Sequence, residues 1–352
     1  MKMDELEREP SFALLGPGFS GGALTLLREL RRAAAGERAR GARLVFAPYE
    51  SSGDAPRVYT AAREDAPLEM LAGSASEAER APLEIALESD GYAAAIAAIR
   101  ESIAAGDVYQ VNFTLRARLP ALRGAQLAAR LCRRGVPAFF AWVRFPEGDE
   151  FLSASPELFF ALDGARVRCE PMKGTAAPER EAALEASGKD RAELAMITDL
   201  MRNDLVPVCA DGSVRVACER RFLRLPYAVQ AVSDVEGQLR EGVGALEVLA
   251  ALHPGGSITG APKRAAMRAI AALERTPRGA YCGALGLVEE LPGEARERAR
   301  FSILIRTAQR DPIASGPLGA RAWSYGVGGG IVWQSNADDE LREIELKLGA
   351  LR

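Results

Sequence analysis

The chain has 352 residues, of which 48% are hydrophobic and 26% charged, and its 45 basic side chains nearly balance 48 acidic ones. This composition is typical of a globular protein, and the formal net charge of −3 gives no basic surface of the kind that binds nucleic acid. The charged start of the chain lacks the apolar run of a secretory signal, and no stretch is apolar enough to span a membrane. We therefore expect a cytoplasmic protein that binds neither nucleic acid nor a membrane.

Histidine and cysteine usage narrows the possible chemistry further. His253 is the single histidine, which excludes any site that needs two histidines. The five cysteines form no CxxC pair, so they indicate neither a zinc site nor a disulfide framework. Acid–base chemistry in this chain would have to depend mainly on Lys, Glu, Asp or Tyr.

The first clear elements lie near residue 100. Apolar residues recur at helical spacing over 92–103, and Gly106 ends that predicted helix. Apolar and polar residues then alternate over 109–119, as in a strand with one apolar and one polar face.

Later segments mix strands and helices without strict alternation, which favours an α+β fold over a doubly wound parallel one. We predict strands at 151–160, 165–170, 281–288, 300–307 and 322–333, a helix at 189–205, and a last helix whose apolar stripe is formed by Leu341, Ile344, Leu348 and Leu351.

Four motifs have more than one interpretation. The segment 253–263 places Thr259 near the cap of a predicted helix and Pro262 in its first turn. This pattern is typical of an anion site at a helix start, or simply of a well-capped helix. It is not a nucleotide-binding P-loop, because the Gly-Lys-Ser/Thr of that motif is missing. The glycines of 326–330 indicate either close approach of a ligand or backbone, or a bulge.

The other two motifs carry charge. Lys173, in a predicted Gly-Thr turn, is either a nucleophile with a depressed pKa or a solvated surface charge. Asp190 and Glu193 share one helix face, and Glu343 lies on another helix. Carboxylates from two helices suit Mg²⁺ better than zinc, although such faces are often only solvated.

Together these segments resemble the chorismate-utilising enzymes, a family that includes anthranilate synthase component I, aminodeoxychorismate synthase component I, and the isochorismate and salicylate synthases. The matching stretches follow the family order: 106–112, 155–159, 171–175, 189–193, 199–205, 254–263, 278–281, 305–307 and 328–330. The resemblance implies a single α+β fold in which antiparallel sheets pack face to face with helices outside. Residues 86–352 would form the chorismate-binding catalytic domain, and 1–85 a short N-terminal segment of the same fold.

The resemblance also implies roles for individual residues. Glu193 and Glu343 match the positions that hold Mg²⁺ against the ring carboxylate of chorismate, and Glu157 matches the general acid that assists departure of the 4-hydroxyl. The substrate-binding positions are Gly174, Thr175, Tyr281, Arg306, Gly328, Gly329, Gly330 and Lys347.

Three positions bear on the choice among family members. Gln110 stands where isochorismate and salicylate synthases have a lysine base, which disfavours attack by water. Lys173 stands where anthranilate synthases have alanine, as in aminodeoxychorismate synthases, in which the lysine is thought to add to C2. Gln230 stands where anthranilate synthases have a histidine, which removes one possible proton donor near C4.

The resemblance therefore favours aminodeoxychorismate synthase component I, which converts chorismate and ammonia to 4-amino-4-deoxychorismate for p-aminobenzoate and folate synthesis. Since the sequence shows no glutaminase motif, we expect a glutamine amidotransferase subunit to supply the ammonia. The alternatives are anthranilate synthase component I and a non-catalytic chorismate-binding protein.

Overall fold

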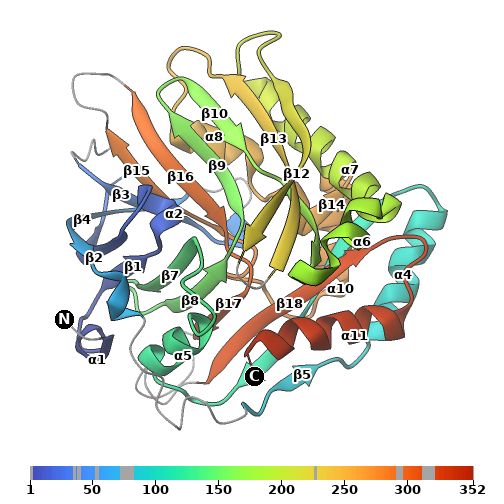
Figure 1. The fold of residues 1–352 in the computed structure, drawn as a ribbon, viewed down its shortest axis with the longest axis horizontal. Coiled ribbons are helices and arrows are strands. Elements are labelled where there is room, and N and C mark those ends of the chain that lie inside the picture. The colour runs from blue at the N-terminus through green and yellow to red at the C-terminus, as the bar shows by residue number, and fades with distance from the viewer. Residues whose placement is uncertain are drawn as a thin grey trace.

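The protein is described here by a computed structural model that covers residues 3–34, 37, 41–51, 55–71, 83–225, 228–290, 296–310 and 322–351. Within these residues, 18 strands are connected by hydrogen bonds, and every strand pair is antiparallel. Helices cover the outside of these strands (Figure 1). This arrangement confirms the predicted α+β fold.

The strands are β1 (Phe12–Leu15), β2 (Leu24–Arg32), β3 (Arg43–Ala47), β4 (Arg57–Ala66), β5 (Ala86–Glu88), β6 (Gln110–Leu119), β7 (Phe139–Arg144), β8 (Glu150–Ser155), β9 (Leu158–Asp163), β10 (Arg166–Cys169), β11 (Met172–Ala176), β12 (Arg215–Leu225), β13 (Ala228–Gln238), β14 (Gly260–Ala261), β15 (Ala284–Glu290), β16 (Glu297–Ile303), β17 (Thr307–Arg310) and β18 (Trp323–Ile331).

The α-helices are α1 (Met3–Leu6), α2 (Pro17–Ser20), α4 (Tyr92–Ala104), α5 (Gly124–Leu131), α6 (Glu181–Ala186), α7 (Gly188–Leu205), α8 (Ala245–Leu252), α9 (Gly256–Thr259), α10 (Lys263–Leu273) and α11 (Ala337–Leu348). The 3₁₀ turns are η1 (Tyr49–Ser51), η2 (Leu68–Met70), η3 (Pro178–Arg180), η4 (Val206–Val208) and η6 (Gly349–Leu351).

The order of strand pairing divides the strands into two halves. One half runs β1–β7–β8–β17–β18–β6, the other runs β4–β3–β15–β16–β9–β10–β13, and β2 joins β1 to β4. Phe46 of β3 stacks on Phe145 at 5.0 Å between ring centroids and lies 5.4 Å from Phe151 of β8. Because these rings come from opposite halves and share one buried cluster, the two halves face each other, as expected.

The long amphipathic elements form where their periodicity predicts them. Helix α4 buries Tyr92, Ile96 and Ile99, and α11 buries Ile344 and Leu348, with Leu351 buried in the following turn. Both α7 and α11 begin with side-chain caps, since the Ser187 hydroxyl accepts from the Asp190 N–H and the Asn336 side chain accepts from two N–H groups. Helix α11 packs along β18, and α7 packs against β13 (Figure 1).

Three predicted strands had wrong boundaries. The segment 151–160 forms two strands, because Pro156 lacks the N–H that would continue the ladder, and Glu157 lies at this break. The segment 300–307 is interrupted before β17, where Arg306 has a left-handed backbone with φ of 53°. The strand predicted from 281 begins only at Ala284, after Cys282 with φ of 65°.

Strand β6 alternates as predicted, but its polar face is buried. Gln110, Asn112, Thr114 and Arg116 are all at most 8% exposed. The reason is that β18 pairs along one edge of β6 while α9 and α10 pack against it. Of these side chains, Thr114 and Arg116 bond to protein acceptors, and Asn112 lines an internal cavity.

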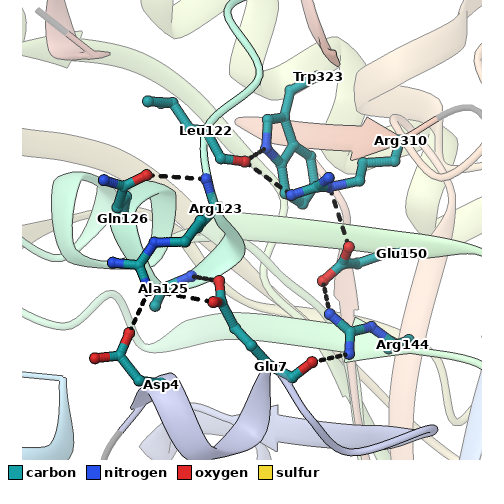
Figure 2. A network of polar contacts seen from close by, with 10 residues as sticks. All are labelled: Asp4, Glu7, Leu122, Arg123, Ala125, Gln126, Arg144, Glu150, Arg310 and Trp323. Carbon is teal, nitrogen blue, oxygen red and sulfur yellow. Dashed lines mark hydrogen bonds and ion pairs between the residues drawn. The ribbon is translucent and has the colours of Figure 1, made fainter. Parts of the chain in front are cut away.

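A buried ionic network connects the start of the chain to the sheet (Figure 2). The carboxylate of Glu150, 1% exposed, pairs with Arg144 at 2.9 Å and with Arg310 at 3.1 Å. Arg144 also donates to the Glu7 carbonyl oxygen, and a Glu7 carboxylate oxygen accepts from the Ala125 N–H at the start of α5. These contacts fix the segment before β1 against β7, β8 and α5.

Two smaller observations concern cysteines and membrane spans. All five cysteines are free, and four are buried. No helix in the described ranges is long and apolar enough to cross a membrane.

Candidate active site

A cavity of about 740 Å³ lies where β11, β18, α7 and α11 meet. It is lined by every site residue predicted from the sequence: Glu157, Lys173, Gly174, Thr175, Glu193, Tyr281, Arg306, Gly328, Gly329, Gly330, Glu343 and Lys347. These residues are dispersed over nearly 200 positions of the chain, and the fold brings all of them to one place.

Glu157 is a buried carboxyl group in the wall of this cavity. It follows Pro156 at the break between β8 and β9 and is 5% exposed. Burial raises its pKa to about 7, although a hydrogen bond from Ser257 and the charge of Lys173 both favour the carboxylate. A carboxyl group with a pKa near neutrality can hold a proton and donate it, as a general acid must.

Lys173 lies on an irregular stretch of β11. The β11–β13 register shifts between Met172 and Thr175, so the expected Gly-Thr turn is in fact a bulge within a strand. Gly174 has φ of 84°, and a Cβ there would lie 2.8 Å from a Leu184 methyl group. Burial lowers the pKa of Lys173, while Glu193 and Glu157 act against that decrease.

The segment 253–263 differs from its predicted form and contributes a residue that sequence reasoning missed. Thr259 ends the short helix α9, and Pro262 is the N-cap of α10 rather than part of its first turn, because Gly260 and Ala261 pair with β6. The Ser257 hydroxyl donates to the Glu157 carboxylate at 2.8 Å. The position of Ser257 within the matching stretch 254–263 was the available signal, but the sequence did not show that its partner is Glu157.

The three glycines of β18 form a smooth wall. The pairing with β6 continues without a register shift from Gly328 to Gly330, so the alternative of a bulge is wrong. A Cβ on Gly328 would lie 2.3 Å from the Phe113 carbonyl oxygen, and one on Gly330 would lie 2.2 Å from the Gln110 side chain. Neighbouring groups therefore leave no room for a Cβ on Gly328 or Gly330, and both glycines line the cavity.

Two large polar side chains complete that wall. Arg306 is half-buried and has a left-handed backbone, an uncommon conformation for a residue other than glycine. Tyr281 is 5% exposed, with the Arg116 guanidinium 5.3 Å from its ring centroid, and burial raises its pKa well above 10. Tyr281 is therefore a neutral donor, and Arg306 is a cation that lines the same cavity, a combination that suits a carboxylate.

The acidic side of the cavity contains Glu193 of α7 and Glu343 of α11. Burial raises the pKa of Glu193 although the charges of Lys173 and Lys189 oppose that increase, and both glutamates line the cavity. Glu343 accepts from Lys347 at 2.8 Å, and this lysine, despite burial, holds the pKa of Glu343 below its ordinary value. Lys347 also donates to the Gly328 carbonyl oxygen at 2.7 Å.

This donor set fits Mg²⁺ better than a softer metal. The described residues contain no group of three or more His, Cys, Asp or Glu side chains that could hold a metal ion on their own. Mg²⁺ commonly binds to one or two carboxylates and completes its shell with water and substrate oxygens. Two carboxylates from different helices that line one cavity meet that requirement, with the remaining ligands to come from water and substrate.

The single histidine lies outside this cavity. The Nε2 atom of His253 is 3.0 Å from the Pro48 carbonyl oxygen, and burial lowers its pKa to about 4. A neutral, internally bonded imidazole outside the cavity is a structural group, which leaves lining residues such as Glu157 and Lys173 as the candidates for acid–base chemistry.

Comparisons with known proteins agree with this geometry. The chain matches the chorismate binding enzyme family over residues 16–352. It is 37% identical to anthranilate synthase component 1 1 of Haloarcula marismortui, over 76% of this chain and 54% of that protein. It is 40% identical to aminodeoxychorismate synthase of Streptomyces pristinaespiralis, over 72% of this chain and 35% of that protein. The chain thus spans about half of the first relative and about a third of the second.

A solved structure matches the fold along nearly the whole chain. The menaquinone-specific isochorismate synthase of Escherichia coli has a TM-score of 0.76 with 18% identity, over 99% of this chain and 89% of that one. At this identity the likeness shows the fold alone. The family match and the sequence relatives together establish that the chain belongs to the chorismate binding enzymes.

Proposed function

We propose that this protein is aminodeoxychorismate synthase component I, which converts chorismate and ammonia to 4-amino-4-deoxychorismate and water for p-aminobenzoate and folate synthesis. The observation that carries the proposal is the lysine at position 173. Its amine shares the cavity with Glu157, and burial changes the pKa of the two groups in opposite directions. An acid and a nucleophile that both operate near neutral pH need this pattern.

The chemistry proceeds in two displacements. The neutral Lys173 amine forms a bond to C2 of the ring, the two ring double bonds shift, and the C4–O bond breaks. Glu157 donates its proton to the departing oxygen, which leaves as water. Ammonia then attacks C4, the double bonds shift back, and the C2–N bond to Lys173 breaks. The enolpyruvyl group stays attached throughout.

The remaining residues bind and orient the substrate. Arg306 and Tyr281, with the backbone of β18, would hold the enolpyruvyl carboxylate, while Gly174 and Thr175 line the ring. Glu193 and Glu343 would hold Mg²⁺, which would neutralise the ring carboxylate and fix its position. The contacts of Lys347 with Glu343 and with the Gly328 carbonyl oxygen support a position for it between the proposed metal site and the β18 backbone.

Anthranilate synthase component I is the second candidate, since relatives with that name match the chain. It would use the same carboxylate and metal positions with ammonia attacking C2 directly. A lysine side chain in the cavity near that carbon disfavours this route, because it would occupy the space that ammonia needs. A non-catalytic binder would have no need for the opposed pKa shifts of Glu157 and Lys173.

The test is to trap the covalent intermediate. The protein is incubated with chorismate and Mg²⁺ without ammonia and quenched in acid, and its intact mass is measured. We expect an adduct equal to chorismate minus one water, which maps to Lys173 and is absent from Lys173→Ala. With ammonium added, the expected product is aminodeoxychorismate; anthranilate, or undiminished turnover by Lys173→Ala, would refute the proposal.

The ammonia source needs its own experiment. We propose that a glutamine amidotransferase subunit delivers ammonia to the cavity. Addition of such a subunit should make turnover depend on glutamine, and a chain that works only with free ammonium in its presence would contradict this partner.

A further inference from the structure

Gln230 is a buried carboxamide that the proposed chemistry leaves without a role. It lies on β13 opposite Thr175 of β11, beside the bulge that presents Lys173. Gln230 lines the cavity and is 2% exposed, and its Oε1 atom has no hydrogen-bond partner in the described part of the chain. It is therefore an acceptor that the protein itself does not satisfy.

Such an unpaired acceptor calls for a donor from outside the protein. A buried polar group without a partner costs about 1–3 kcal/mol, and buried carboxamides normally have partners. Two other polar groups of the cavity have partners within the protein, since Glu157 bonds to Ser257 and Lys347 bonds to the Gly328 carbonyl oxygen. The hydroxyl of Thr175 is exposed and can bond to water. A ligand bound in this cavity can supply the donor that Gln230 lacks.

Chorismate offers a single such donor. It carries two carboxylates and an enol ether, which only accept hydrogen bonds at neutral pH, and one ring hydroxyl at C4. We infer that Gln230 is the specificity-determining residue that accepts the hydrogen bond of this C4 hydroxyl. The inference rests on the proposed function, and it extends that function by naming how the protein recognises the group that leaves.

The bond would also orient the leaving group. Glu157 must deliver its proton to a lone pair of the C4 oxygen, so the hydroxyl hydrogen has to point elsewhere. A hydrogen bond to Gln230 holds that hydrogen away from Glu157 and turns a lone pair toward the acid. The amine that replaces the hydroxyl also carries N–H donors, so the same carboxamide accepts from the product.

Gln110 provides a matched control, because it is a second buried glutamine with an unpaired Oε1 atom. It is 1% exposed and packs against Gly330, but it is not among the residues that line the cavity. If any unpaired carboxamide near Lys173 served equally well, the two glutamines would respond alike to substitution.

The experiment measures binding of chorismate and of a 4-deoxy analogue, with Mg²⁺ and without ammonia. All proteins carry Lys173→Ala so that neither ligand reacts. With Gln230 present, chorismate should bind about tenfold more tightly than the analogue, the effect of one hydrogen bond. Gln230→Met should reduce that ratio toward one, Gln230→Glu should retain a preference because it keeps an acceptor, and Gln110→Met should leave the ratio unchanged.

The outcomes separate this inference from the proposed function. If the protein with Gln230 intact does not bind chorismate, the proposed function fails. If it binds chorismate but Gln230→Met keeps the full ratio, or Gln110→Met abolishes it, the role of Gln230 is refuted while chorismate binding stands. Should Gln230→Met fail to fold, the ratio for Gln230→Glu decides, and a value near one overturns the inference.

Discussion

Replacing Glu157 by glutamine should stabilise the protein in alkaline solution and not in acid. Glu157 is 5% exposed, and burial raises its pKa from the ordinary 4.5 to about 7. Between these two values the folded protein keeps a proton that the unfolded chain has lost. The folding free energy contributed by this group is therefore fully present below pH 4.5 and is lost as pH rises through 7.

The size of the effect follows from the two pKa values. The difference between 4.5 and about 7, at about 1.4 kcal/mol per pH unit, amounts to about 3 kcal/mol. Glutamine has a similar shape and can still accept from Ser257, but it does not ionise. As pH rises from 4.5 to 8.5, the unmodified protein should therefore lose about 3 kcal/mol of unfolding free energy relative to Glu157→Gln.

Urea unfolding at several pH values measures this difference directly. Ser257→Ala provides an internal check, since loss of a hydrogen bond to the carboxylate removes about 1.5–3 kcal/mol of stabilisation from the charged form. The pKa of Glu157 should then rise further, and the alkaline decline in turnover should move upward by one pH unit or more. A stability difference that does not change with pH would show that Glu157 ionises normally and would refute its role as an acid.

The remaining predictions concern the metal, the substrate carboxylate and the core. Glu193→Gln and Glu343→Gln should each raise the Mg²⁺ concentration needed for turnover at least tenfold; wild-type activity at limiting Mg²⁺ would remove that residue from the metal site. Arg306→Lys should raise KM for chorismate more than it lowers kcat, because lysine keeps the charge but loses the two-pronged geometry, and an unchanged KM would contradict the assignment. Glu150→Gln should lower the unfolding free energy by about 3 kcal/mol or more, since it removes the negative charge that the buried Arg144 and Arg310 share; equal urea midpoints would show that the network is not stabilising.

Periodicity predicted the elements in which apolar and polar residues alternate regularly. The stripe of α11 and the alternation of β6 are properties of neighbouring residues, so they are visible without knowledge of the fold. Strand ends were predicted less well, because they depend on single residues. Pro156 breaks one strand, and the left-handed backbone of Arg306 breaks another. Both breaks place a predicted functional side chain in the cavity.

The membership of the site was predictable for a different reason. Glu157, Lys173 and the glycines of β18 lie in motifs that resemble a family, so their proximity came from that resemblance and not from the physics of the chain. Contacts between motifs were not accessible in this way. The bond from Ser257 to Glu157 and the unpaired oxygen of Gln230 each depend on side chains from distant strands or helices, which only the folded chain brings together.

The burial of Glu157 and Lys173 in one cavity resolves a conflict between their charges. In water at pH 7 both groups would be ionised, and an ammonium beside a carboxylate can neither attack carbon nor donate the proton that a leaving hydroxyl needs. Coulombic attraction between them favours that inactive pair, as the opposing contributions to both pKa values show. Burial has the larger effect in each case, so it raises the pKa of the acid, lowers the pKa of the amine and brings the two values closer together. A polar substitution in the cavity wall that admits water should therefore return the pKa of both Glu157 and Lys173 toward its ordinary value. Turnover should then fall further than the loss of the replaced side chain's own contacts would explain.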